Sequence, residues 1–200
     1  EEDEEKILVS VSTTTGSIII NKLMGKGTDH PKVGVSAFLA LDHDKKKLYM
    51  ASGQQGRIIQ RVAITEDSVK PVKPAEQLHE DCCWLQGIAV DVVTDRVYWV
   101  NRTAGSIKSI AAASNLLGQG EVVLLPDAAP NGMGLALDLK KGKGWVYWTT
   151  QNSHSPNEIR RTFVCEDGQV SQDYVDELGG ETYETVHSDN AASSFAGIAV

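Results

Sequence analysis

A repeat with a period of 49 residues is the feature that most constrains the fold of this 200-residue chain. One tyrosine in each copy lies in a run of strand-forming residues, and these are Tyr49, Tyr98 and Tyr147. An apolar segment ending in aspartate precedes each run, and these aspartates are Asp42, Asp91 and Asp138. Repeating units of this length, each with several short strands, predict an all-β protein: a β-propeller with four-stranded antiparallel blades.

The copies predict a single propeller domain over residues 6–200, behind an acidic segment at residues 1–5. The expected parts are a half blade at 6–30, three blades at about 37–80, 85–128 and 133–186, and an isolated first strand at 195–200. If the two terminal pieces share one blade, four blades are present and the termini close the ring. Alternatively, the chain is a fragment of a larger ring. No helix is expected beyond a helix-compatible run at 111–119, and residues 166–194 are expected to hold an outer strand and an insertion.

Charge, hydrophobicity and cysteine content argue against several classes of protein for this chain. The formal net charge is −8, with five negative charges in residues 1–5, so there is no electrostatic reason to bind nucleic acid. No apolar stretch is long enough to predict insertion into a membrane. Cys82, Cys83 and Cys165 do not form a disulfide framework, and they leave both reduced thiols and one bridge from Cys165 open. Residues 101–103 match the glycosylation acceptor pattern, which matters only in a secreted protein.

One face of the predicted propeller gathers the candidate binding residues. In a four-stranded meander, the links between second and third strands lie on the same face as the links between blades, and such loops usually carry function. The polar or aromatic residues expected there are Gln54, Gln55, His79, Asp81, Trp84, Asn101, Arg102, Asn131, Gln151 and His154. An exposed Trp84 would be the best anchor for a partner.

Two strand sequences resemble a known family. Residues 97–101 (VYWVN) and 146–150 (VYWTT) resemble the YWTD repeats of low-density-lipoprotein-receptor-type β-propellers, and residues 87–91 (GIAVD) fit the same pattern. The resemblance implies a six-bladed parent ring, an extracellular or secretory location, and binding of protein ligands or support of neighbouring modules. The aspartate of the motif is replaced in the three copies by Ser52, Asn101 and Thr150. The side-chain contacts that this aspartate makes in the family are therefore not carried over to this chain.

The sequence favours a non-enzymatic scaffold that binds a protein or glycan partner on this face. It lacks the Gly-x-Ser-x-Gly, phosphate-loop and His-Glu-x-x-His motifs, and the His79–Trp84 cluster lacks metal-ligand spacing. We therefore expect no metal site and no cofactor. The alternative is a metal-dependent propeller hydrolase, similar to lactonases, with calcium on the axis. Candidate ligands for that ion are Asn101, Asp127, Asn131 and Asn190.

Overall fold

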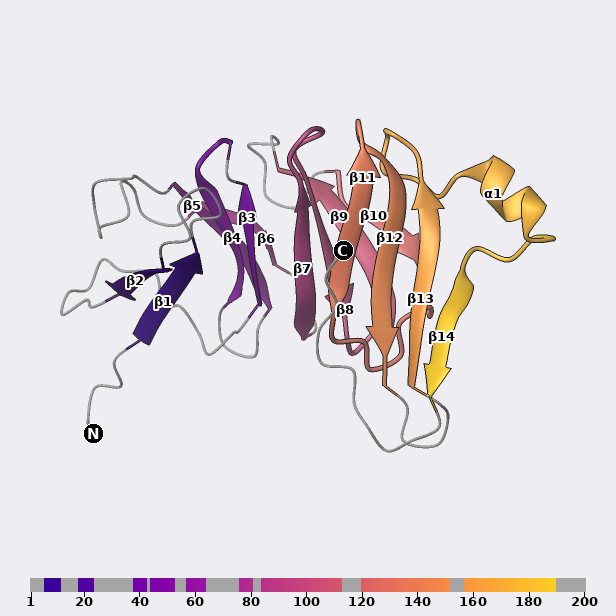
Figure 1. Cartoon of the computed structure of the whole chain (residues 1–200), viewed down its shortest axis with the longest axis horizontal. Helices are drawn as coiled ribbons and strands as arrows, with labels where there is room; N and C mark the ends of the chain where they lie inside the picture. Colours follow the sequence, from indigo (N-terminus) through magenta and orange to yellow (C-terminus); the bar gives the residue numbers. More distant parts are fainter. Residues whose placement is uncertain are drawn as a thin grey trace.

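Most of the described chain lies in antiparallel β-strands. The computed structural model describes residues 6–11, 18–23, 38–42, 44–52, 57–63, 76–80, 84–112, 120–151 and 157–189. These residues form three four-stranded sheets, one two-stranded hairpin and one short helix (Figure 1). The three sheets are consecutive blades, so the predicted blade architecture is confirmed. No helix among the described residues is long and apolar enough to cross a membrane.

Each four-stranded blade pairs its strands in chain order. The first blade contains β3 (Phe38–Asp42), β4 (Lys47–Ser52), β5 (Ile58–Ala63) and β6 (Glu76–Glu80). The second contains β7 (Leu85–Asp91), β8 (Arg96–Asn101), β9 (Ser106–Ala111) and β10 (Val122–Leu125). The third contains β11 (Leu135–Lys140), β12 (Lys143–Thr150), β13 (Asn157–Val164) and β14 (Glu184–Asp189). The N-terminal half copy forms a hairpin of β1 (Lys6–Val11) and β2 (Ile18–Leu23).

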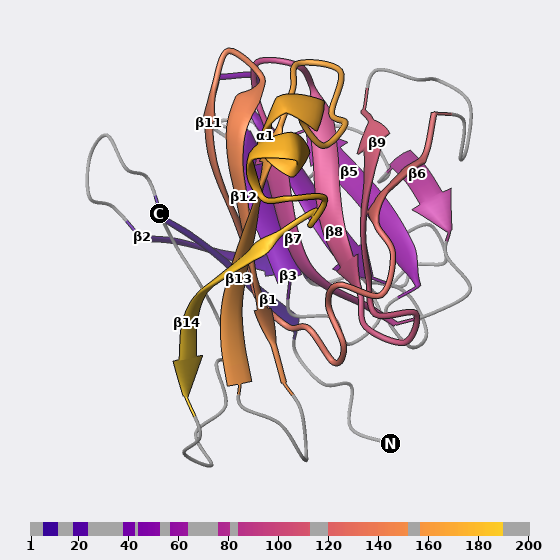
Figure 2. The ribbon, with the colours of Figure 1, turned by 90° about the vertical axis from the view of Figure 1, so that its right-hand side faces the viewer.

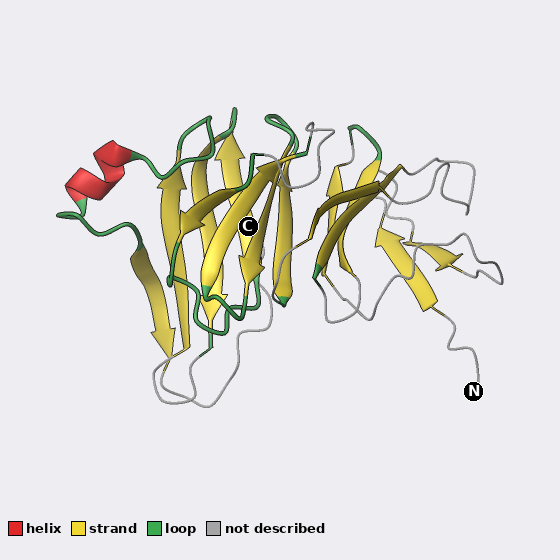
Figure 3. Cartoon of the chain, turned by 180° about the vertical axis from the view of Figure 1, so that it is seen from behind, coloured by secondary structure: helices red, strands yellow, loops and turns green. Residues whose placement is uncertain are grey.

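The link between β13 and β14 contains a helix that the sequence analysis did not predict. This helix, α1 (Gln172–Glu177), begins after Ser171, whose hydroxyl accepts a 3.4 Å hydrogen bond from the amide of Tyr174. A serine cap satisfies an amide that a helix otherwise leaves unpaired. The expectation of no helix in this link was therefore wrong, while β14 provides the expected outer strand (Figure 3).

The predicted sharing of a blade between the termini stays a prediction. Residues 1–5 and 195–200 lie outside the described residues. The β1–β2 hairpin and the third blade lie at opposite ends of the row of sheets in two views (Figures 1 and 3). Of the cysteines, Cys165 is a free thiol, and Cys82 and Cys83 are outside the described residues.

Side chains on both faces of β8 are buried, which explains why its sequence does not alternate. Val97 and Trp99 belong to the core between the first and second blades. Tyr98 and Val100 belong to the core between the second and third blades. A strand covered on both faces reads as a continuous apolar run.

The first strands of the blades, β3, β7 and β11, lie beside one another. Gly87 in β7 has φ +49°, and a Cβ atom there would lie 2.6 Å from the carbonyl oxygen of Met133. Glycine therefore allows the second blade to approach the chain entering the third blade.

Candidate functional site

Trp84 and Arg102 form the clearest exposed unit on the predicted binding face. Trp84 precedes β7 and is 47% exposed, and Arg102 lies in the turn between β8 and β9. The amide of Arg102 donates a 2.9 Å hydrogen bond to the carbonyl of Trp84, and the Arg102 guanidinium lies 6.0 Å from the indole centroid. The amide of Trp84 also donates to the Thr103 hydroxyl, at 3.4 Å. The backbone thus holds an exposed aromatic ring beside a cation.

Asn101 shapes this turn from within. Its side chain is completely buried, and its Oδ1 accepts a 2.9 Å hydrogen bond from the amide of Ala104. Gly105 then adopts φ +64°, a conformation that glycine reaches without steric cost. Asn101 therefore positions Arg102 and does not itself face a partner. The asparagine of the glycosylation acceptor pattern is likewise inaccessible in the folded chain.

The next link between blades repeats this arrangement. The amide of Ala129 donates to the carbonyl of Gly105 at 2.7 Å, and the amide of Gln151 donates to the carbonyl of Pro130 at 3.2 Å. Asn131, next to Pro130, is exposed in a left-handed conformation with φ +49°, and Gln151 is half-buried. The structure thus brings Asn131 and Gln151 together, as it does Trp84 and Arg102.

His79 lies in the interior and not on the loop face. It is buried on β6 with its ring centroid 5.1 Å from that of Trp99 in the second blade. Its Nε2 lies 3.0 Å from a carboxylate oxygen of Glu121, whose other oxygen lies 2.9 Å from Lys108 Nζ. His79 therefore joins two blades. The other predicted residues, Gln54, Gln55, Asp81 and His154, lie outside the described residues.

The structure describes three of the four residues that were considered for an axial ion. Asn101 uses its side-chain oxygen within its own turn. Asp127 and Asn131 are exposed, and Asn190 lies outside the described residues. Within the described ranges, no three His, Cys, Asp or Glu side chains are grouped closely enough to hold a metal ion.

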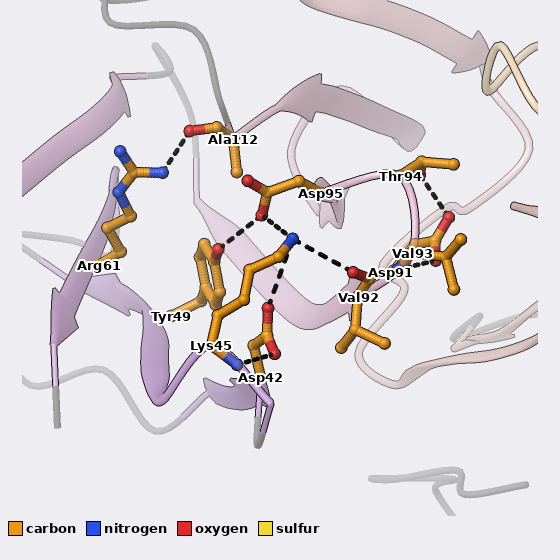
Figure 4. Close-up of polar contacts among 10 residues, drawn as sticks. All are labelled: Asp42, Lys45, Tyr49, Arg61, Asp91, Val92, Val93, Thr94, Asp95 and Ala112. Carbon is orange, nitrogen blue, oxygen red and sulfur yellow. Dashed lines mark hydrogen bonds and ion pairs between the residues drawn. The ribbon is translucent and has the colours of Figure 1, made fainter. Parts of the chain in front are cut away.

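Sequence reasoning missed a polar network on the opposite face of the blades (Figure 4). Lys45, in the β3–β4 turn, extends its ammonium group to the β7–β8 turn, 3.3 Å from Asp95 and 3.2 Å from the carbonyl of Val92. Tyr49 donates its hydroxyl proton to the same Asp95 carboxylate at 3.1 Å. Burial, followed by the charge of Asp95, raises the pKa of the Tyr49 hydroxyl. This network ties the first blade to the second.

The recurring aspartates explain why these turns are ordered. Asp42 accepts a 2.9 Å hydrogen bond from the amide of Lys45. Asp91, at the same place in the second blade, accepts from the amide of Val93 at 3.0 Å and from the hydroxyl of Thr94. Aspartate favours turns because its side chain pairs with nearby backbone amides. The repeated aspartate was a usable sequence signal for this face.

Comparisons with known proteins show the fold. No family model matches the chain, and no curated protein matches it. A solved structure of a nidogen/laminin complex contains a chain that is 15% identical, with a TM-score of 0.61, covering 91% of this chain and 57% of that one. A putative 6-phosphogluconolactonase from Bacteroides uniformis is 12% identical, with a TM-score of 0.54, covering 94% and 52%.

The PQQ-bound aldose sugar dehydrogenase from Streptomyces coelicolor is also similar. It is 16% identical, with a TM-score of 0.55, covering 97% of this chain and 65% of that one. At these identities the likeness shows the fold alone, and it places the chain among the β-propellers. The chain spans between 52% and 65% of the length of these three propeller chains.

Proposed function

We propose that this chain is a non-enzymatic β-propeller scaffold that binds a protein or glycan partner on the face around Trp84 and Arg102. The observation that carries the proposal is that Trp84 is 47% exposed while its backbone carbonyl and amide are both hydrogen-bonded, to Arg102 and Thr103. Tryptophan and arginine are enriched among the residues that dominate binding energy. A residue whose backbone is already held in this way loses less conformational entropy when a partner covers it.

The surroundings of the ring support a role in recognition. Exposed Asn131 and half-buried Gln151 belong to the next link between blades on the same face. Amide side chains around an aromatic anchor match the polar rim of protein interfaces. The similarity to a chain in a nidogen/laminin complex supports a protein partner. Membership of the YWTD-type propellers and an extracellular location complete the proposal, supported by the tyrosine–tryptophan repeats.

A capture experiment with matched variants tests this function. Wild type, Trp84→Ala and Val93→Ala are each immobilised and exposed to the secreted proteins of the source organism. The same three proteins are also tested on a glycan array. Val93 is 62% exposed in the β7–β8 turn, on the opposite face, so its variant controls for loss of a surface hydrophobic side chain. We expect that at least one ligand binds to wild type and to Val93→Ala but not to Trp84→Ala.

Thermal unfolding of the three proteins provides the folding control. Because Trp84 is largely outside the core, its truncation should leave the unfolding temperature close to that of wild type. Identical capture by all three folded proteins would exclude the Trp84 face as the binding site.

A further inference from the structure

The link between the second and third blades contains the only asparagine of the sequence that is followed by glycine. This pair, Asn131 and Gly132, lies between β10 and β11. Asparagine is one of the thermolabile residues. A glycine after it has no Cβ atom to hinder attack of its backbone nitrogen on the asparagine side chain. The link therefore contains a pair whose chemistry favours loss of the side-chain amide.

The packing of the link against two blades requires glycine at position 132. A Cβ atom there would lie 2.9 Å from the carbonyl oxygen of Thr149 in β12. It would also lie 2.9 Å from Cγ1 of Val100 in β8. A Cβ atom does not normally come within 3.0 Å of such atoms, and the carbonyl of Thr149 belongs to the backbone of a paired strand. The approach of the link to both blades thus imposes the reactive pair on the sequence.

The fold exposes one partner of this reaction and restrains the other. Asn131 is exposed, so solvent reaches its side chain. The amide of Gly132, which would have to attack that side chain, donates a 2.9 Å hydrogen bond to the carbonyl of Ala129. This bond holds the proton that must leave before the nitrogen can attack, and breaking it costs free energy. The native arrangement therefore slows the reaction.

Hydrogen bonds from the third blade keep the link in this arrangement. The carbonyl of Ala128 accepts a 2.8 Å bond from Nε1 of Trp148. The amide of Gly134 donates a 2.9 Å bond to the hydroxyl of Thr149, in the interior. The Gly132 amide is released only when this part of the link moves away from the blade. Opening of the link is therefore the step that controls the chemistry.

We propose that Asn131 is a modification site controlled by the fold, and that it converts to aspartate or isoaspartate when the link opens. The Gly132 nitrogen gives its proton to hydroxide and bonds to Cγ of Asn131. The Cγ–Nδ2 bond then breaks, and ammonia leaves with a proton from water. Solvent water adds to the cyclic imide and opens the ring. Opening at Cγ gives aspartate, and opening at the main-chain carbonyl carbon gives isoaspartate.

The reaction changes the face of the propeller that carries Trp84. Figure 2 shows α1 at one end of the third blade, and β11 begins at the other end because it runs parallel to β13, which leads into α1. Either product replaces a neutral amide by a carboxylate and so adds a negative charge at this end. Isoaspartate also lengthens the main chain by one carbon atom next to Gly132, where no space is spare.

Peptide mapping by mass spectrometry at mildly alkaline pH tests the proposal. The native full chain and the same chain in guanidinium chloride are incubated in parallel, and labelling by an isoaspartyl methyltransferase distinguishes the two products. We expect conversion of Asn131 to be at least about tenfold faster in denaturant, because only the opened fraction of native molecules reacts. Asn101, which is followed by Arg102, is the internal control and should stay largely unmodified in both samples.

Two isosteric variants separate opening of the link from global unfolding. Thr149→Val removes the hydroxyl that accepts the bond from Gly134. Thr162→Val removes an equally buried hydroxyl, which donates to the carbonyl of Thr182 within the third blade. Thr149→Val should speed conversion of the native chain severalfold, and Thr162→Val should leave the rate close to that of wild type. Hydrogen exchange of the Gly132 amide measures the opening directly.

Several results would overturn the proposal. Native chain that converts as fast as denatured chain would show that the fold does not control the reaction. Equal acceleration by the two variants would assign the reaction to global unfolding. A denatured chain that does not convert at Asn131, or a Gly132 amide that exchanges without protection, would also contradict it. If circular dichroism shows that Thr149→Val does not fold, the wild-type rates and the exchange measurement still decide.

Discussion

The hydroxyl of Tyr49 donates a 3.1 Å hydrogen bond to the carboxylate of Asp95, which lies 46 residues further along the chain and in the next blade. Lys45 approaches the same carboxylate at 3.3 Å. The repeated tyrosine of the sequence is therefore a contact between blades. Its equivalent in the second blade, Tyr98, is also fully buried, but its Oη has no hydrogen-bond partner among the described residues.

Replacing these two tyrosines by phenylalanine should give different results. Tyr49→Phe should lower the free energy of unfolding by about 1–2 kcal/mol, because a buried hydrogen bond to a charged group is lost. Tyr98→Phe should be neutral or slightly stabilising, since it removes a buried hydroxyl without a described partner. Urea denaturation of both variants measures the difference. Equal losses in the two variants would show that the Tyr49–Asp95 bond contributes nothing specific.

Stability should fall at alkaline pH because of these tyrosines. Burial raises the pKa of Tyr98 from 10.0 to about 12, and the pKa of Tyr49 rises in the same direction. Between about pH 10 and 12 the unfolded chain releases tyrosine protons that the folded chain retains. The free energy of unfolding therefore decreases as the pH rises. For each of these tyrosines the decrease is at most about 1.4 kcal/mol per pH unit. Urea denaturation across this range measures the slope. Tyr98→Phe should make this slope smaller. An unchanged slope would contradict the conclusion that burial raises the pKa of Tyr98.

Gly87→Ala should be strongly destabilising. Its Cβ would lie 2.6 Å from the Met133 carbonyl oxygen, and the backbone is already at φ +49°. We expect a loss of about 2–4 kcal/mol in thermal or urea unfolding. Gly179→Ala is the matched control, because Gly179 has φ +68° but no atom within 4 Å of the added Cβ. Similar losses in the two variants would mean that the backbone angle, and not the close approach of β7 to the third blade, sets the requirement for glycine.

Calcium should not change stability if the chain is a binding scaffold. Thermal unfolding is measured with a chelator and then with millimolar calcium. An ion that binds only the folded chain would raise the unfolding temperature as its concentration rises. We expect coincident curves, and a clear rise with calcium would favour the propeller hydrolase with an axial ion.

The blades could be predicted from the sequence because the strand-forming run around the tyrosine recurs every 49 residues, each time after an apolar segment that contains an aspartate. Helix α1 was missed because six residues are too few for a helical period to appear, although Ser171 before Asp173 is a helix-start signal. The order of strands predicts that Trp84 and Arg102 lie on the same face, but their direct contact came only from the structure. The burial of His79 could not, because it depends on Trp99 and Glu121, which the next blade supplies.

The central claim is that Trp84 and Arg102 act together as a binding anchor. The most direct test is a double-mutant cycle on the affinity of a captured partner for wild type, Trp84→Ala, Arg102→Ala and the double variant. Each single change should weaken binding at least tenfold, about 1.4 kcal/mol. The double variant should lose less than the sum, because the guanidinium lies over the ring and neither residue acts alone. Unchanged affinity in all three variants would contradict the account and place the partner on another face of the propeller.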